Sequence, residues 1–273
     1  MLKNQRHVEI LEILKNQSFA SVHELGERLY ASQPTIRRDL DILEKQGYIR
    51  RSHGGAMLAD DKGGAPVSFR RGTKTQEKMR ICRLAATLIN AGDVIFIDAS
   101  TTASYLADHI RESDGVIVVS NGYQVCRTLV ENNVKIFSTG GRMLRDSMAF
   151  AGRFAEKTVS EFNADIMFFS CSGLNMDGVI SDYSEEEISL RHVMHSRAKN
   201  TVFLCDSGKF GGTSAFREFL LSELDYVVTD EPLPAEILKK SSFILALESD
   251  GAYLYKNSDI SKSDTDTDNT EKG

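Results

Sequence analysis

The 273-residue sequence has no apolar run long enough to cross a membrane. A membrane-spanning helix needs about 18 consecutive apolar residues, and every apolar segment here is shorter than that. The N-terminal stretch MLKNQRHVEILEILKNQ is charged throughout and lacks the apolar core of a signal peptide. These absences predict a cytoplasmic protein that does not bind a membrane.

The chain contains only four cysteines, and their spacing matches no metal or disulfide motif. Cys82, Cys126, Cys171 and Cys205 are scattered, without a CxxC pair or a Cys/His cluster. This usage is typical of a reduced intracellular protein whose thiols are small core residues. We therefore predict no disulfide, no metal site and no bound cofactor. Hydrophobic residues make up 41% of the chain, which is ample for a packed core, and the length favours two domains.

Positive charge is scarce overall but locally concentrated. The whole chain carries a net charge of −6, and its sequence pI is about 5.6. Residues 1–56, by contrast, have nine Lys and Arg against seven Asp and Glu, a net charge of +2, and four of the arginines lie within the segment 37–51. A basic head on an acidic body indicates a polyanionic partner for the head alone.

The head has the pattern of three short helices. In RHVEILEILKNQ the apolar residues recur at helical spacing and predict a first helix of about three turns. Ser21 can cap a second helix. Ser32 can cap a third, which has Pro34 in its first turn, where a missing N–H costs nothing. Gly47 can end this third helix as its C-cap.

A basic hairpin follows the third helix. YIRRSH is typical of a strand, and the next two glycines permit a tight turn into a return strand. Three helices and a hairpin make a winged helix-turn-helix. The third helix has a buried stripe formed by Ile36, Leu40 and Leu43. Its two arginines point away from that stripe.

The third helix has the chemistry of a DNA-reading helix. A helix-turn-helix places the N-terminal half of its second motif helix in the major groove, where arginine can hold guanine through O6 and N7. Hydroxyl and amide groups at the same end can reach phosphates or base edges, and the wing can lie along the backbone or a minor groove. The predicted DNA contacts are Ser21, Ser32, Gln33, Thr35, Arg37, Arg38, Arg50, Arg51 and His53.

The alternative for this helix is a solvated face on which Arg37 or Arg38 pairs with Asp41. The two arginines lie at the start of the helix, outside its apolar stripe, and a basic hairpin follows. We therefore favour double-stranded operator DNA as the partner. Asp39 is expected to orient an arginine or satisfy a backbone group, because phosphates repel a carboxylate.

The stretch SVHELGERLYASQPTIRRDLDILEKQGYIRRSHGGA, residues 21–56, resembles the N-terminal signature of the DeoR family of bacterial transcription regulators. The family pattern has an ELA-type second helix, a V-S-x-x-T-I-R-R-D-L recognition helix and a G-x-x-x-R-x-H-G-G-A wing. Two positions differ from it. Ala31 stands where valine is usual, and Gly26 replaces the alanine of ELA, which weakens the second helix by about 1 kcal/mol.

The rest of the chain has the pattern of a largely parallel α/β sheet. Residues 1–57 form the predicted DNA-binding domain, 58–72 a linker interrupted by glycine and proline, 73–256 an effector-sensing domain and 257–273 a disordered tail. Short apolar strands separated by amphipathic helices are typical of such a sheet. The expected strands are 94–98, 116–120, 135–138, 166–170, 201–205, 226–229 and 243–247, and the expected helices are 74–89, 102–111, 122–131, 153–161, 185–198 and 233–239.

Small polar residues follow several of the expected strands. The loops are DASTT (98–102), SNG (120–122), TGGR (139–142), SCSGL (170–174) and DSGKFG (206–211). In parallel sheets, ligands bind beyond the carboxyl ends of the strands. The backbone N–H groups and hydroxyls of 100–102 suit a phosphate, and Arg142 and Lys209 add positive charge. Each loop alone is an ordinary turn, but five at one edge predict a small anionic ligand.

These loops also resemble those of the DeoR C-terminal sensor domain, which is similar in fold to ribose-5-phosphate isomerase and coenzyme A transferases. The resemblance implies a phosphorylated sugar or related metabolite as effector, with its phosphate at residues 100–102 and Lys209 near its polar end. Gly208 stands where the family has serine, and Arg191 where lysine is common. The predicted effector contacts are Asp98, Ser100, Thr101, Thr102, Asn121, Gly140, Gly141, Arg142, Ser172, Gly173, Asp206 and Lys209.

The alternative function is a sugar-phosphate isomerase or transferase with an appended DNA-binding head. Isomerisation needs a carboxylate base beside a phosphate-anchored sugar, and the isomerase motif D-G-A-D resembles CSGL here, without either acid. Residues 185–187 are typical of the exposed, acidic start of a helix, and His192 and His195 of surface positions. We therefore predict no catalytic residue and a regulator, a repressor of sugar or related carbon metabolism that works as a homodimer or homotetramer.

Overall fold

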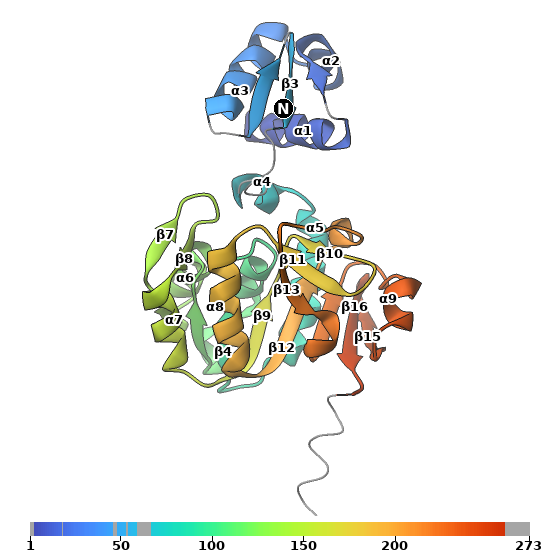
Figure 1. Ribbon diagram of the computed structural model, residues 1–273. Coiled ribbons are helices and arrows are strands. Elements are labelled where there is room, and N and C mark those ends of the chain that lie inside the picture. Colours follow the sequence, from blue (N-terminus) through green and yellow to red (C-terminus); the bar gives the residue numbers. More distant parts are fainter. Residues whose placement is uncertain (1–2, 18, 46–47, 53, 59–66, 260–273) are drawn as a thin grey trace, which may run out of the picture. The chain divides into compact units, whose positions relative to one another are not determined.

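The computed structural model describes residues 3–17, 19–45, 48–52, 54–58 and 67–259. The backbone divides into two compact units, Met1–Thr73 and Lys74–Gly273 (Figure 1). In the described part of the chain, no helix combines the length and the apolar character that a membrane span requires.

Three helices form the head around one small core. They are α1 (Lys3–Asn16), α2 (Val22–Arg28) and α3 (Gln33–Lys45). The expected stripe of α3, formed by Ile36, Leu40 and Leu43, is buried against α1 and α2. Ser32 precedes the first residue of α3, and its Oγ accepts a hydrogen bond from Thr35 N at 3.4 Å. The predicted three-helix head and its cap are confirmed, whereas Gly47 lies outside the described residues.

The wing is a three-stranded antiparallel sheet rather than a bare hairpin. Its strands are β1 (Ala20–Ser21), β2 (Ile49–Ser52) and β3 (Gly55–Leu58), in the order β1-β3-β2. A Cβ at Gly55 would lie 2.2 Å from Ala20 O, so β1 can pair here only with a glycine. The hairpin pattern did not include β1, because two residues are too short for any periodicity.

A buried ion pair fastens α1 to α3. Asp39 Oδ2 accepts a hydrogen bond from Arg6 Nε at 2.5 Å, and Asp39 Oδ1 lies 3.0 Å from His7 Nε2. The Asp39 side chain is only 3% exposed. As expected, this carboxylate orients an arginine and does not face solvent. Asp39 therefore holds α3 against α1.

The end of the predicted linker is helical. Val67–Gly72 form the short helix α4, where the sequence predicts an irregular segment. A Cβ at Gly72 would lie 3.5 Å from Val8 Cγ2 of α1, so α4 packs on the head. Packing of this kind can stabilise a six-residue helix that has no periodicity of its own.

The second unit is built on an eight-stranded sheet with the order β15-β16-β14-β12-β9-β4-β5-β6. The six strands from β14 to β6 are mutually parallel, and β16 and β15 close one edge in antiparallel fashion. The predicted, largely parallel sheet is therefore confirmed. The strands are β4 (Val94–Ile97), β5 (Ile117–Ser120), β6 (Lys135–Ser138), β9 (Ala164–Phe169), β12 (Ala198–Cys205), β14 (Tyr226–Thr229), β15 (Phe243–Ser249) and β16 (Ala252–Asn257).

Helices cover both faces of this sheet (Figure 1). Alternate residues of β4 point to opposite sides, so that Ile95 and Ile97 join one core and Phe96 the other. The first core packs under α5 (Thr75–Ala85), α6 (Tyr123–Glu131) and the 3-10 helix η2 (Ala103–His109). The second packs under α7 (Arg153–Ser160), α8 (Glu185–Ser196) and α9 (Ala235–Lys239).

Several elements differ from the expectation. The helix predicted at 102–111 is the 3-10 helix η2. Strand β16 was not predicted, although Asp250 and Gly251, with φ of 51° and 68°, form a typical hairpin turn before it. A second antiparallel sheet and a hairpin are also additional: β10 (Gly173–Leu174), β11 (Val179–Asp182), β13 (Phe216–Leu220), β7 (Arg142–Leu144) and β8 (Ala149–Ala151). The other short 3-10 helices are η1 (Ala86–Leu88), η3 (Glu112–Asp114), η4 (Ser207–Lys209) and η5 (Leu221–Glu223).

The substitution Asp39→Asn should destabilise the head. It removes the charge of a buried carboxylate and breaks its ion pair with Arg6, which typically costs about 3 kcal/mol. Asp41→Asn is the matched control, because Asp41 is 61% exposed in its pair with Arg51 and such pairs contribute at most about 1 kcal/mol. Hydrogen exchange of the α1 and α3 amides measures both free energies of unfolding. Equal losses in the two variants would contradict the role of Asp39.

Candidate functional site

The N-terminal half of α3 presents polar and basic side chains to solvent. Ser32, Gln33, Arg37 and Arg38 are exposed, on the side of α3 opposite its buried stripe. Thr35 is half-buried, and its Oγ1 lies 2.9 Å from Ser32 Oγ. Neither arginine makes an ion pair with another described residue. The arrangement leaves two guanidinium groups available at the end of the helix that a helix-turn-helix inserts into DNA.

The wing arginines behave differently from one another. Arg50 is exposed, whereas Arg51 is directed at α3. Arg51 Nη1 donates to Asp41 Oδ1 at 2.6 Å and to Arg37 O at 3.3 Å, and Arg51 N donates to Glu44 Oε1 at 2.9 Å. Arg51 therefore positions the wing against α3. The sequence predicted it only as a DNA contact and did not predict this structural role.

Two further predicted DNA contacts stand apart from the exposed face of α3. Ser21 is the N-cap of α2, and its Oγ accepts a hydrogen bond from Glu24 N at 3.1 Å. The Ser21 hydroxyl therefore caps α2. His53 lies outside the described residues.

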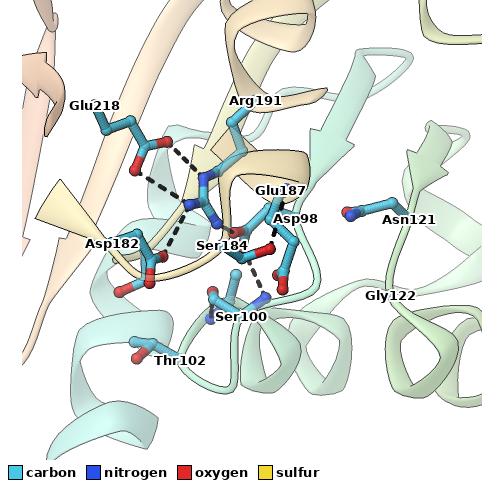
Figure 2. Close-up of polar contacts among 12 residues, drawn as sticks. Asp98, Ser100, Thr102, Asn121, Gly122, Asp182, Ser184, Glu187, Arg191 and Glu218 are labelled. Atoms are coloured by element: carbon cyan, nitrogen blue, oxygen red, sulfur yellow. Dashed lines mark hydrogen bonds and ion pairs between the residues drawn. The ribbon is translucent and has the colours of Figure 1, made fainter. Parts of the chain in front are cut away.

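In the second unit, the buried side chain of Arg191 joins three carboxylates. Figure 2 shows this guanidinium between acids that come from three different elements. Arg191 Nε donates to Glu218 Oε1 at 2.5 Å, Nη2 donates to Asp182 Oδ2 at 2.8 Å, and Nη1 donates to Asp98 Oδ2 at 3.3 Å. Arg191, at 2% exposure, is the largest fully buried side chain of the described residues. The sequence marked Arg191 only as a departure from a usual lysine.

These carboxylates outnumber the guanidinium that they share. Burial raises the pKa of Glu218 to about 7, although Arg191 acts to lower it. Burial also raises the pKa of Asp98, against the opposing effect of Arg191, and Glu187 of α8 adds to the increase. Glu187 was predicted to be part of an exposed helix start, but it is half-buried and its charge reaches Asp98. Protons or hydrogen-bond donors are therefore favoured at this end of the site.

Cationic side chains gather at the turn after β4. Lys209 Nζ donates to Ser170 Oγ at 2.6 Å and to Thr102 Oγ1 at 3.3 Å, and it lies 3.2 Å from Asp206 Oδ2. The structure thus brings together four residues that the sequence placed at three separate strand ends. Ser100 completes the turn, since Ser100 N donates to Asp98 Oδ1 at 3.1 Å.

Two lysines at the start of α5 join the same cluster, and sequence reasoning missed both. Lys78 Nζ lies 3.5 Å from Thr101 Oγ1, and Lys74 Nζ donates to Ser207 Oγ at 2.8 Å. Burial acts to raise the pKa of Asp206, but Lys209, Lys78 and Lys74 together bring it below its ordinary value. We name Lys74, Lys78 and Lys209 the lysine cluster. The spacing of Lys74 and Lys78, one helical turn apart in KTQEK, was the signal available.

Asn121 lies between the acidic end of the site and the β7–β8 hairpin. Its Nδ2 donates to Phe150 O at 3.2 Å, while its buried Oδ1 has no hydrogen-bond partner among the described residues. In Figure 2 the amide points toward Asp98. The next residue, Gly122, packs closely against the loop after β4, since a Cβ there would lie 3.0 Å from Ala99 Cα. An unpartnered buried acceptor here suits a hydroxyl group of a ligand.

The remaining predicted effector contacts are engaged elsewhere. Arg142, on β7, is exposed and pairs with Glu186 at the start of α8. A Cβ at Gly141 would lie 2.7 Å from Ala151 O, so this glycine serves the hairpin. The positive charge predicted for Arg142 is thus already neutralised, and Gly140, with a φ of 61°, turns the chain toward β7.

Ser172 and Gly173 contact residues that surround the site. Ser172 Oγ donates to Asp182 Oδ1 at 2.6 Å and so positions a carboxylate of the Arg191 group. A Cβ at Gly173 would lie 2.7 Å from Gly212 O, which explains why the two loops can touch.

The histidines of α8 are not simply surface residues. His192 is exposed, but His195 is half-buried and its Nδ1 lies 2.9 Å from Thr201 Oγ1. Both rings pack on Phe219, at centroid distances of 4.5 and 5.0 Å. They hold α8, and with it Arg191, against β13.

Two family models match the chain. Residues 6–62 match the DeoR-like helix-turn-helix domain, and residues 73–231 match the DeoR C terminal sensor domain. The chain belongs to the DeoR family. This member is a transcriptional regulator with an N-terminal DNA-binding domain and a C-terminal sensor domain.

Curated relatives cover most of the chain. The glycerol-3-phosphate regulon repressor of Escherichia coli (strain K12) is 31% identical over 240 residues, which is 88% of this chain and 95% of the relative. An uncharacterized HTH-type transcriptional regulator of Bacillus subtilis (strain 168), YulB, is 33% identical over 239 residues, 87% of this chain and 93% of the relative.

Among solved structures, ribose 5-phosphate isomerase A from Methanocaldococcus jannaschii is similar at a TM-score of 0.39 and 13% identity. The match covers 72% of this chain and 88% of the isomerase. A likeness of this size carries no functional argument.

The stability of the DeoR sensor domain should fall as the pH rises from about 4.5 to about 7. The native state holds a proton on Glu218, whose pKa is about 7, and the unfolded chain has released it at an ordinary pKa of 4.5. The stabilisation that this proton gives the folded state is therefore fully present below pH 4.5 and is lost as the pH rises past 7. Over this interval the free energy of unfolding falls by no more than about 1.4 kcal/mol per pH unit. Urea unfolding at several pH values measures this slope.

The matched variant for this test is Glu218→Gln, which has no proton to release. It should flatten the pH dependence over the same interval. An unchanged slope in Glu218→Gln would show that another group is responsible.

Proposed function

We propose that this protein is a repressor of genes for sugar or related carbon metabolism, released from its operator by a phosphorylated sugar-type effector. The observation that carries the effector class is the lysine cluster, which surrounds the hydroxyl groups of Thr101 and Thr102 next to the buried Arg191 group. The regulon named for the Escherichia coli relative, that of glycerol-3-phosphate, is consistent with a small phosphorylated ligand.

The DNA half of the proposal depends on α3. Its N-terminal half would enter the major groove, with Arg37 and Arg38 contacting bases or strands and with Ser32, Gln33 and Thr35 contacting phosphates or base edges. Arg50 would contact the adjacent backbone. One helix-turn-helix in each chain favours a homodimer or homotetramer that reads repeated half-sites about one helical turn apart.

The effector half depends on opposite chemistry at two ends of one site. A phosphate would bind at the lysine cluster, where ammonium groups and threonine hydroxyls can donate hydrogen bonds to it. The hydroxyl groups of the ligand would donate to Asp98 and accept from or donate to Asn121, whose Oδ1 is unpartnered. A short phosphorylated polyol or sugar has both kinds of group at opposite ends.

We infer that the protein is not an enzyme. Glu218 has a pKa of about 7, which would suit a general base. Its side chain is fully buried, however, and both carboxylate oxygens accept hydrogen bonds from Arg191. A base held in this way cannot reach a substrate proton. The curated relatives named above are regulators, which supports the same conclusion.

Lys74 would couple the effector to the DNA-binding domain. It is the first residue of the second unit, its backbone is left-handed with a φ of 51°, and its Nζ, which belongs to the lysine cluster, donates to Ser207 Oγ. A phosphate that draws this ammonium group to itself would change the backbone where the chain leaves for α4. A near-complete switch needs the effector to prefer the DNA-free state by about 5.5 kcal/mol.

The substitution Arg38→Ala should weaken DNA binding by about 1–3 kcal/mol, because it removes a guanidinium contact in the groove. The measurement is fluorescence anisotropy with the duplex that the wild-type chain selects from a random-sequence pool. Arg127→Ala is the control, since Arg127 is also exposed but lies on α6 of the other unit. Wild-type affinity in Arg38→Ala would remove α3 from the interface.

The substitution Lys209→Met should impair effector binding and leave DNA affinity without effector unchanged. A thermal-shift screen of phosphorylated sugars and polyols, each beside its unphosphorylated form, identifies ligands by the rise in melting temperature. Loss of one charge-assisted hydrogen bond should cost about 1.5–3 kcal/mol of binding. Lys199→Met, at an exposed lysine, is the control.

Two outcomes would count against this division of roles. One is an equal effect of Arg38→Ala and Lys209→Met on DNA affinity in the absence of ligand. The other is turnover of the ligand found in the screen, which would favour the enzyme.

A further inference from the structure

Tyr30 lies in the turn between α2 and α3 and combines a left-handed backbone with an almost fully exposed side chain. Its side chain is 96% exposed, and its backbone φ is +50°. Tyr30 N donates to Glu27 O at 3.4 Å and Ala31 N donates to Gly26 O at 3.0 Å. These two bonds are the Schellman pattern that ends a helix, and they require a left-handed residue at the position of Tyr30.

Tyrosine is a poor choice for that position on grounds of stability. Left-handed backbone favours glycine, asparagine and aspartate, because a Cβ crowds the following carbonyl. Of the other non-glycine residues with a left-handed backbone in the described chain, Asn133 and Asp250 follow this preference, whereas Lys74 and Met148 do not. Packing does not compensate at Tyr30, because its side chain makes no hydrogen bond or ring contact with another described residue. Its neighbour Leu29, by contrast, is 3% exposed and belongs to the core.

Tyr30 also lies at the end of α3 that the proposed function places on DNA. Three residues separate it from Pro34, and two of them, Ser32 and Gln33, are exposed. A tyrosine hydroxyl is one of the groups that contact phosphates beside the groove and set the register of a reading helix. The residues around it are polar, with Glu27 and Arg28 exposed as well, so it is not part of an extended apolar surface that would indicate a protein partner.

We propose that Tyr30 is a DNA-contact residue whose phenol hydroxyl donates a hydrogen bond to a phosphate flanking the groove that α3 enters. The proposal rests on the proposed role of α3 as the reading helix. It explains why a residue that is unfavourable for the turn and absent from the core occupies this position. The contact adds affinity without sequence information, because phosphates are the same at every base pair.

The test compares Tyr30→Phe with the wild-type chain on two duplexes of equal length, the one selected from a random-sequence pool and an unrelated one. Loss of one hydrogen bond should raise Kd about 3- to 10-fold, by the same factor on both duplexes. The slope of log Kd against log salt concentration should not change, because a neutral hydroxyl displaces no counterion. Tyr123→Phe, at a half-exposed tyrosine on α6, is the control and should bind as the wild type does.

A second variant, Tyr30→Gly, separates function from stability. It should raise the melting temperature of the head, because glycine suits the left-handed turn, and weaken DNA binding at least as much as Tyr30→Phe. A merely structural role for Tyr30 would give the opposite result, a lower melting temperature. Wild-type DNA affinity in Tyr30→Phe would overturn the proposal, as would a change of oligomeric mass without a change in Kd.

Arg38→Ala, measured beside these variants, distinguishes the two levels of failure. If Arg38→Ala weakens binding and Tyr30→Phe does not, the contact of Tyr30 is wrong and the reading helix stands. If neither changes the Kd of a chain that binds DNA, α3 is not the reading helix, and both proposals fail.

Discussion

The sensor domain depends on the buried ion pairs of Arg191. Its guanidinium, on α8, holds Glu218 of β13, Asp182 of β11 and Asp98 at the end of β4, so one side chain fastens a helix, the small second sheet and the main sheet together. A guanidinium can do this because it has five donors in a planar fork, which a lysine ammonium lacks. Leaving any one of these carboxylates buried without it would cost several kcal/mol.

The excess of acid around Arg191 also sets the polarity of the candidate site. Negative charge is concentrated at Asp98 and its neighbours, and positive charge at the lysine cluster on the other side of residues 100–102. Because Arg191 is engaged by its carboxylates, it is not available to an anion. Under the proposed function, the phosphate of the effector would therefore bind at the lysine cluster, and this contact would set the orientation of the ligand.

Local patterns were sufficient for most elements and for the buried stripe of α3, since Ile36, Leu40 and Leu43 are buried where helical spacing puts them. They were not sufficient for contacts between distant residues. Arg191 meets Asp98 across 93 positions and Lys74 meets Ser207 across 133, and no spacing in the sequence records either. The same limit explains Arg142: its position after a strand predicted a free charge, but its partner Glu186 comes from a helix 44 residues later.

In the head, the wing determines which arginines remain free. Asp41 is one turn beyond Arg37 on α3 and could have neutralised it as an i,i+4 pair. Arg51 of β2 occupies Asp41 instead, and its backbone also engages Glu44. Asp41 and Glu44 of α3 are thereby engaged by the wing. The positive charges of Arg37 and Arg38 at the N-terminal end of α3 are therefore not neutralised by these two carboxylates. Because Asp41 and Glu44 are already engaged by Arg51, they oppose the approach of DNA less, as the proposed role of α3 requires.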